Sequence, residues 1–105
     1  MSLKEQMSEI LKRKKKLHMN DDFATYKCWE EMIELLSKNE VDTISYLELS
    51  NADDLHHVRE VFEEISEKFQ SSEFIKCLRR LDIKYPELEM TTDIDIAADW
   101  GGIDG

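Results

Sequence analysis

Hydrophobic residues recur every three or four positions along most of the chain, which is the spacing of one face of an α-helix. The clearest stretch begins at residues 50–53 and carries five apolar residues, namely Leu55, Val58, Phe62, Ile65 and Phe69. Counted from Asp53 at 100° per residue, these five fall between about 120° and 200°. We therefore expect one continuous helix that turns this stripe toward the core.

Acidic residues occupy the opposite side of the same predicted helix. Asp53, Glu60, Glu64 and Glu67 all lie within about 40° of the direction of Asp53 on the helical wheel, opposite the apolar stripe. Charged faces of amphipathic helices are usually just solvated, so a stripe of acids is not by itself a binding site. It becomes a candidate surface here because further acids gather elsewhere in the chain.

The same three-four spacing predicts five more helices. Capping groups start the second helix at 20–22, the fifth at Ser71-Ser72 and the sixth at Thr92, where Asp95 completes a capping box. Pro86 ends the fifth helix near Tyr85, because the residue before a proline leaves the helical region. The inward positions include Phe23, Tyr26, Val41 and Ile96. The predicted ranges are 3–18, 23–36, 41–49, 50–69, 72–85 and 92–100.

These elements predict an all-α fold of about six antiparallel helices in one domain, residues 1–105. The three glycines lie at the C-terminus and proline occurs once, so the turn residues of a β-rich fold are missing. A faint similarity at an offset of 29 or 30 residues leaves an irregular bundle and a short HEAT-like hairpin stack both open. The 101–105 segment is either a helix stop that belongs to the fold or a disordered tail.

The charge is unevenly distributed along the chain. There are 24 acids and 14 bases, a formal net charge of −10. Residues 1–20, the predicted basic N-terminal helix, carry +4 and include the run Lys12–Lys16, whereas residues 21–105 carry −14. No base follows Lys84. Five consecutive bases point all round a helix, so we interpret the run as a solvated helix end, and the net charge argues against nucleic acid and anionic membranes as partners.

Nothing in the sequence has the pattern of a catalytic or metal site. His56 and His57 are adjacent, so they point about 100° apart on a helix and at most one shares a face with Asp53. Cys28 and Cys77 lack a catalytic signature and a paired spacing, and are typical of reduced, buried thiols. There is no internal glycine for a phosphate loop. We therefore predict no enzyme activity, no metal and no cofactor.

The sequence also lacks targeting segments. The basic run is not followed by an apolar stretch, so it does not have the form of a signal peptide. No apolar run approaches the roughly 18 residues that a membrane helix needs. The expected location is the cytoplasm.

Two segments carry a resemblance to a known class of proteins. They are 46–55, with the sequence YLELSNADDL, and 72–86, which contains SEFI and KYP, with acid-rich helices between them. Over roughly residues 23–100 the chain resembles the small, acidic, helical immunity proteins of bacterial toxin–immunity systems. The resemblance implies an inhibitor of a cognate toxin, often a basic nuclease, with no reaction of its own.

The sequence therefore favours a module that binds a basic protein through acidic helical surfaces. An aromatic residue beside acids, such as Trp100, has the composition of an interface hot spot. A helical adaptor or regulatory subunit in a host complex is the alternative, and an enzyme ranks third. The oligomeric state stays open. The candidate partner-binding residues are Asp53, Glu60, Glu64, Glu67, Asp93, Asp95 and Asp99.

Overall fold

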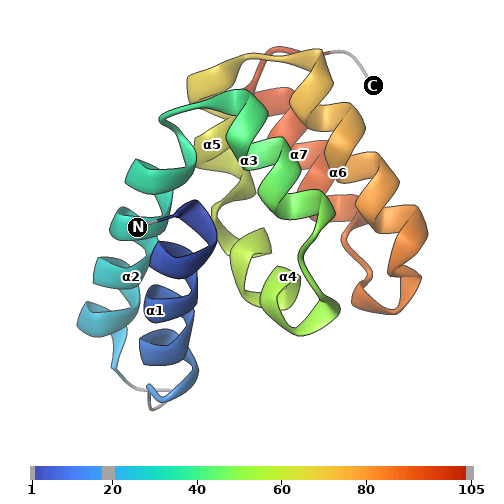
Figure 1. The fold of residues 1–105 in the computed structure, drawn as a ribbon. Coiled ribbons are helices and arrows are strands. Elements are labelled where there is room, and N and C mark those ends of the chain that lie inside the picture. Colours follow the sequence, from blue (N-terminus) through green and yellow to red (C-terminus); the bar gives the residue numbers. More distant parts are fainter. Residues whose placement is uncertain (1, 18–20, 104–105) are drawn as a thin grey trace.

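The computed structural model describes residues 2–17 and 21–103, and throughout that part of the chain the regular structure is helical (Figure 1). The all-α fold class is confirmed. His18, Met19, Asn20 and Asp104 lie outside the described residues. The elements are α1 (Leu3–Lys15), α2 (Asp22–Leu36), α3 (Glu40–Glu48), α4 (Ala52–Val58), the 3-10 helix η1 (Arg59–Val61), α5 (Phe62–Phe69), α6 (Ser72–Lys84), the 3-10 helix η2 (Pro86–Leu88) and α7 (Thr91–Trp100).

Side-chain caps fix the start of five helices. In each, the capping oxygen accepts a hydrogen bond from the backbone N–H three residues later, which satisfies a donor that the first turn leaves unpaired. The capping box predicted at Thr92 is wrong. Met90 occupies the cap position of α7, without a side-chain hydrogen bond, and Thr91 already belongs to the helix. The five caps are Ser2, Asp21, Asn39, Asn51 and Ser71.

The long helix predicted over 50–69 is broken into α4, η1 and α5. The chain leaves helical geometry at Val61, where φ is −117° and ψ is 10°. Val61 lies off the predicted apolar stripe, yet only 1 % of it is exposed. Val61 is thus buried beside the stripe at the residue where the chain bends. The core-facing role of Leu55, Val58, Phe62 and Ile65 is confirmed, since all four are buried.

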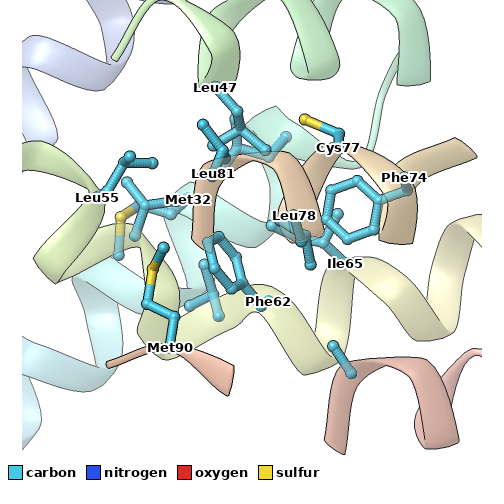
Figure 2. Packing of buried hydrophobic residues seen from close by; sticks show 14 of the residues in the cluster. Met32, Leu47, Leu55, Phe62, Ile65, Phe74, Cys77, Leu78, Leu81 and Met90 are labelled. Carbon is cyan, nitrogen blue, oxygen red and sulfur yellow. The ribbon is translucent and has the colours of Figure 1, made fainter. Parts of the chain in front are cut away.

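The core gathers around α6. Figure 2 shows Leu78 and Phe74 of α6 among side chains from α5, including Phe62 and Ile65. Leu81 extends the same cluster toward other helices. Side chains of α2, α3, α4 and the start of α7 complete it, among them Met32, Leu47, Leu55 and Met90.

Four residues predicted to face inward are exposed instead. Phe23 and Tyr26 are 79 % and 61 % exposed, because the first turns of α2 extend beyond the main core (Figure 1). In α3 the buried positions are Thr43 and Leu47. The Thr43 hydroxyl donates to the Leu36 carbonyl at 2.6 Å, which fixes the rotation of α3 and leaves Val41 outside. In α7 the buried set is Ile94, Ala97 and Ala98, so Ile96 lies at the surface.

The helices form a compact bundle in which two neighbouring pairs run parallel. Residues 40 and 71 are hydrogen-bonded near the starts of α3 and α6, and residues 48 and 80 are paired further along both helices. Residues 66 and 97 join α5 to α7 in the same manner. The chain returns through α4, η1 and α5 between the first two helices and through α6 and η2 between the second two, so these parallel pairs are compatible with antiparallel packing of consecutive helices.

The C-terminal residues 101–103 belong to the fold. The N–H of Ile103 donates to the Ala98 carbonyl at 2.8 Å, and Gly102 has a φ of +70°. This combination is a Schellman cap, in which glycine takes the left-handed position that other residues adopt only with strain. Ile103 is half-buried against the core.

Candidate functional site

Four acids follow η1 and α5 along the surface, and we call them the acidic face. Three of them lie within about one turn of α5, and the fourth precedes them across the bend at Val61. Two are exposed and two are half-buried. α5 packs against α7 and also contacts α2 and α6. The acidic face consists of Glu60, Glu63, Glu64 and Glu67.

Aromatic residues of α2 form one edge of the acidic face. The indole N–H of Trp29 donates a hydrogen bond to Glu60 Oε1 at 3.2 Å. Tyr26 packs edge-on against Trp29, with ring centroids 5.2 Å apart and an interplanar angle of 77°. Because Tyr26 is 61 % exposed, this aromatic pair is open to a partner.

Apolar residues of α7 lie at the other edge. Ile96 and Trp100 are one turn apart and are 39 % and 45 % exposed. Trp100 comes two turns after Asp93, so both lie on the same side of α7. Asp93 in turn lies close enough to Glu63 to influence its charge. The acids are therefore flanked by exposed apolar groups on both sides.

Glu63 and Glu64 of the acidic face are not paired with a base among the described residues, whereas Glu60 is paired with Lys14. Burial, together with the neighbouring carboxylates of Glu64 and Asp93, raises the pKa of Glu63. The Glu64 Oε2 atom is buried and has no hydrogen-bond partner. A buried carboxylate oxygen without a partner is costly. A cation brought beside Glu63 by another molecule would relieve the repulsion among these carboxylates.

The structure brings together only part of the predicted partner-binding set. Glu60, Glu64 and Glu67 share the acidic face, and Asp93 borders it. Asp93 also accepts from Arg59 Nε at 2.6 Å. Arg59 holds the η2 turn as well, by donating to the carbonyls of Leu88 and Glu89. Asp93 is thus partly neutralised and has a structural role.

The other three predicted acids lie away from the acidic face. The bend at η1 separates Asp53 from it, and Asp53 pairs with Lys15 at 2.7 Å. The Lys15 ammonium holds the pKa of Asp53 below its ordinary value. Asp95 lies on the α6 side of α7 and pairs with Arg79 at 2.7 Å. Asp99 is exposed on the outer side of α7.

The basic run is not simply a solvated helix end, as the sequence suggested. Lys14 pairs with Glu60, and its side chain is only 8 % exposed. Lys15 pairs with both Asp53 and Asp54, the latter at 2.8 Å. The N-terminal bases therefore neutralise part of the predicted acidic stripe within the chain itself.

Sequence reasoning missed Glu63, Trp29 and Tyr26 as parts of this site. On a straight 50–69 helix Glu63 points about 80° away from Asp53, so it was excluded from the stripe. Tyr26 and Trp29 follow a helical spacing that is typical of a core face. The unusual density of acids in 60–67 was the one signal that pointed to Glu63.

The described residues offer little reactive chemistry. No three His, Cys, Asp or Glu side chains among them are placed to bind a metal ion. Cys28 and Cys77 are buried free thiols, and burial raises the pKa of Cys77 to about 11. A thiol that stays protonated is a poor nucleophile.

A hollow of about 530 Å³ lies between α1, α3 and the start of α4, and no acidic-face residue lines it. In the described ranges, no helix has the length and apolar character required to cross a membrane. Comparisons with protein families, with curated proteins and with solved structures find no match to this chain.

Proposed function

We propose that this chain is a protein-binding module that captures a basic partner through the acidic face and its two aromatic edges. The observation that carries the proposal is the uncompensated charge at Glu63 and Glu64, beside exposed Trp100 on one side and Tyr26 on the other. Acids crowded together beside exposed aromatic rings are poorly explained by folding alone, because they do not stabilise the isolated chain.

Charged groups and apolar groups would contribute to recognition of the partner in different ways. The carboxylates of the acidic face attract and orient a basic surface, which raises the association rate and fixes the register. Burial of Trp100 and Tyr26 then slows dissociation, because a few desolvated aromatic anchors hold most of the binding energy of an interface. Lys or Arg side chains of the partner would pair with the exposed carboxylate of Glu67 and with the half-buried carboxylate of Glu63.

Within this function we favour an immunity protein that neutralises a basic toxin domain, such as a nuclease, in the bacterial cytoplasm. A nuclease groove is basic because it holds phosphates, so an acidic helical surface of complementary charge can occupy and block it. The support is the resemblance of residues 23–100 to that class together with the acidic face. No step of chemistry by this chain is required.

A helical adaptor is the second candidate. Val41, Leu49 and Ile83 are 72 %, 88 % and 81 % exposed, and none belongs to the acidic face or its edges. An adaptor that used these apolar groups would associate at a rate nearly independent of salt. A charge-driven immunity pair would associate markedly more slowly as salt rises.

Capture from a bacterial host that encodes the chain, followed by purification of the captured protein, tests the proposal. The decisive variant is E63K/E67K, and the matched control is E73K/E87K, which changes the net charge equally at exposed positions of α6 and η2. We expect a basic protein that the wild type and the control bind and that E63K/E67K loses. Equal binding by all three forms would refute the proposed site.

The identity of that protein separates the two candidates. If it is a toxin domain, its activity in a purified assay should disappear when the wild-type chain is added in equimolar amount and persist with E63K/E67K. If it has no toxic activity, or if its association rate does not change with salt, the adaptor function is supported instead. Glu60 is not used for charge reversal, because its pairing with Lys14 and Trp29 makes it part of the fold.

A further inference from the structure

A lysine, a histidine and a glutamate meet where the last turn of α1 reaches α4 and η1. The Lys14 Nζ atom lies 3.0 Å from His57 Nδ1 and also pairs with Glu60. Because an ammonium group only donates hydrogen bonds, His57 must accept at Nδ1 and carry its proton on Nε2. The contact therefore requires a neutral imidazole.

Charged side chains from α1, η1 and α4 surround His57. α1 contributes Lys14 and Lys15, and η1 contributes Glu60. α4 itself contributes the neighbouring His56 and Asp53, the latter already paired with Lys15. Trp29 of α2 reaches the group only through its hydrogen bond to Glu60 and bears no charge. Since Asp53 is paired with Lys15, Glu60 is, among the described residues, the carboxylate that Lys14 and a protonated His57 would share.

We propose that the Lys14–His57 contact is a pH-labile latch, which holds the last turn of α1 against α4 and η1 while His57 is neutral and releases it when His57 is protonated. Protonation removes the acceptor at Nδ1 and places a second cation beside a lysine that is only 8 % exposed. The latch does not depend on the proposed function.

The sign of the pH dependence follows from the surroundings of His57. Burial, followed by the Lys14 charge, lowers its pKa below the ordinary 6.5. The docked state therefore binds the proton less readily than the released state. Its extra stability is complete above pH 6.5 and is lost as the pH falls from 6.5 through the lowered pKa.

Hydrogen exchange of the backbone amides of residues 12–15 at pH 7.5 and pH 5.3, corrected for the intrinsic exchange rate, measures the latch. In the wild type, protection should fall by up to about tenfold for each pH unit between the two pKa values of His57. In H57Q it should stay constant, because the Gln amide oxygen accepts from Lys14 at both pH values. The matched control is H56Q, at the exposed neighbouring position, which should behave as the wild type does.

A second measurement does not depend on how well H57Q folds. The NMR titration of His57 should give a pKa below 6.5 in the wild type and a value closer to 6.5 in K14M, which lacks the ammonium group. The latch is refuted if H57Q loses protection as the wild type does, if the wild type keeps its protection at pH 5.3, or if K14M leaves the His57 titration unchanged.

Discussion

Ser66 and Gly101 approach each other so closely that a Cβ atom on residue 101 would lie 2.5 Å from the Ser66 Oγ atom. The Ser66 hydroxyl also donates to the Ala97 carbonyl, one turn before Gly101 on α7. The φ of Gly101 is −82°, which any residue adopts, so this glycine is needed for space and not for its backbone freedom. The close approach holds α5, with its acids, beside the Trp100 edge of α7.

Replacing Gly101 by Ala should therefore destabilise the fold. The added methyl group overlaps Ser66 Oγ and presses on the Ser66 carbonyl oxygen, which would lie 3.1 Å away. Overpacking of this kind costs about 1–3 kcal/mol in the free energy of unfolding. Urea denaturation followed by circular dichroism measures it. In the S66A background the cost should be smaller, because the methyl group then has room; an equal cost in both backgrounds would rule out this clash.

The helices and much of the core could be predicted from the sequence because both depend on local spacing. Capping residues such as Ser71 can be recognised by their residue type, and the spacing of the apolar residues from Leu55 to Ile65 predicts which face of the helix is buried. The bend at Val61 could not be predicted, because the spacing of the apolar residues in 50–69 is also compatible with one continuous helix. The parallel packing of α3 on α6 likewise depends on contacts between residues about 31 positions apart.

The candidate site could be predicted only in part, for the same reason. Glu64 and Glu67 share a face because they lie one turn apart within α5, and Glu60 lies just before the bend, where it pairs with Lys14 and Trp29. Asp53 lies two turns before Glu60 and is set apart by its pairing with Lys15. Its pairing with Lys15, 38 residues earlier, is a long-range contact that no local pattern reveals.

Arg59 is expected to stabilise the fold more than a surface arginine does. Its side chain is 19 % exposed and binds Asp93 together with the carbonyls of Leu88 and Glu89. R59M leaves these acceptors without their charged donor and should lower the free energy of unfolding by about 2 kcal/mol. The comparison is R80M, which breaks a pair with Glu48 whose side chains are 55 % and 46 % exposed and which should therefore cost much less than R59M. Equal losses in guanidinium denaturation would contradict the structural role of Arg59.

Glu63 should make the stability depend on pH in the direction opposite to a salt-bridged acid. Because its pKa is raised in the folded state, first by burial and then by Glu64 and Asp93, ionisation destabilises the native protein. Its contribution to stability is complete below the ordinary glutamate pKa and is lost as the pH rises through the raised value. E63Q should therefore be more stable than the wild type at pH 7, by less than about 1 kcal/mol, and equal to it at pH 4.

Salt separates the two causes of the Glu63 shift in the same denaturation experiment. High salt screens the repulsion from Glu64 and Asp93 but leaves the burial of the carboxylate unchanged. The advantage of E63Q at pH 7 should therefore shrink in 0.5 M NaCl without vanishing. A variant less stable than the wild type at pH 7 would show that Glu63 has a favourable partner, contrary to the crowding inferred for the acidic face.

Trp100 should anchor the partner once that protein has been identified by capture. W100A removes a ring that is 45 % exposed at the edge of the acidic face, and it should weaken binding by about 2 kcal/mol, mostly through faster dissociation. The matched control is I83A, an 81 % exposed apolar residue of α6 outside the site, which should bind as the wild type does. Surface plasmon resonance of both variants and of E63K/E67K separates the contributions, because loss of the acids should chiefly slow association. Unchanged dissociation of W100A would remove Trp100 from the interface, and a loss confined to I83A would favour the adaptor function and its apolar surface.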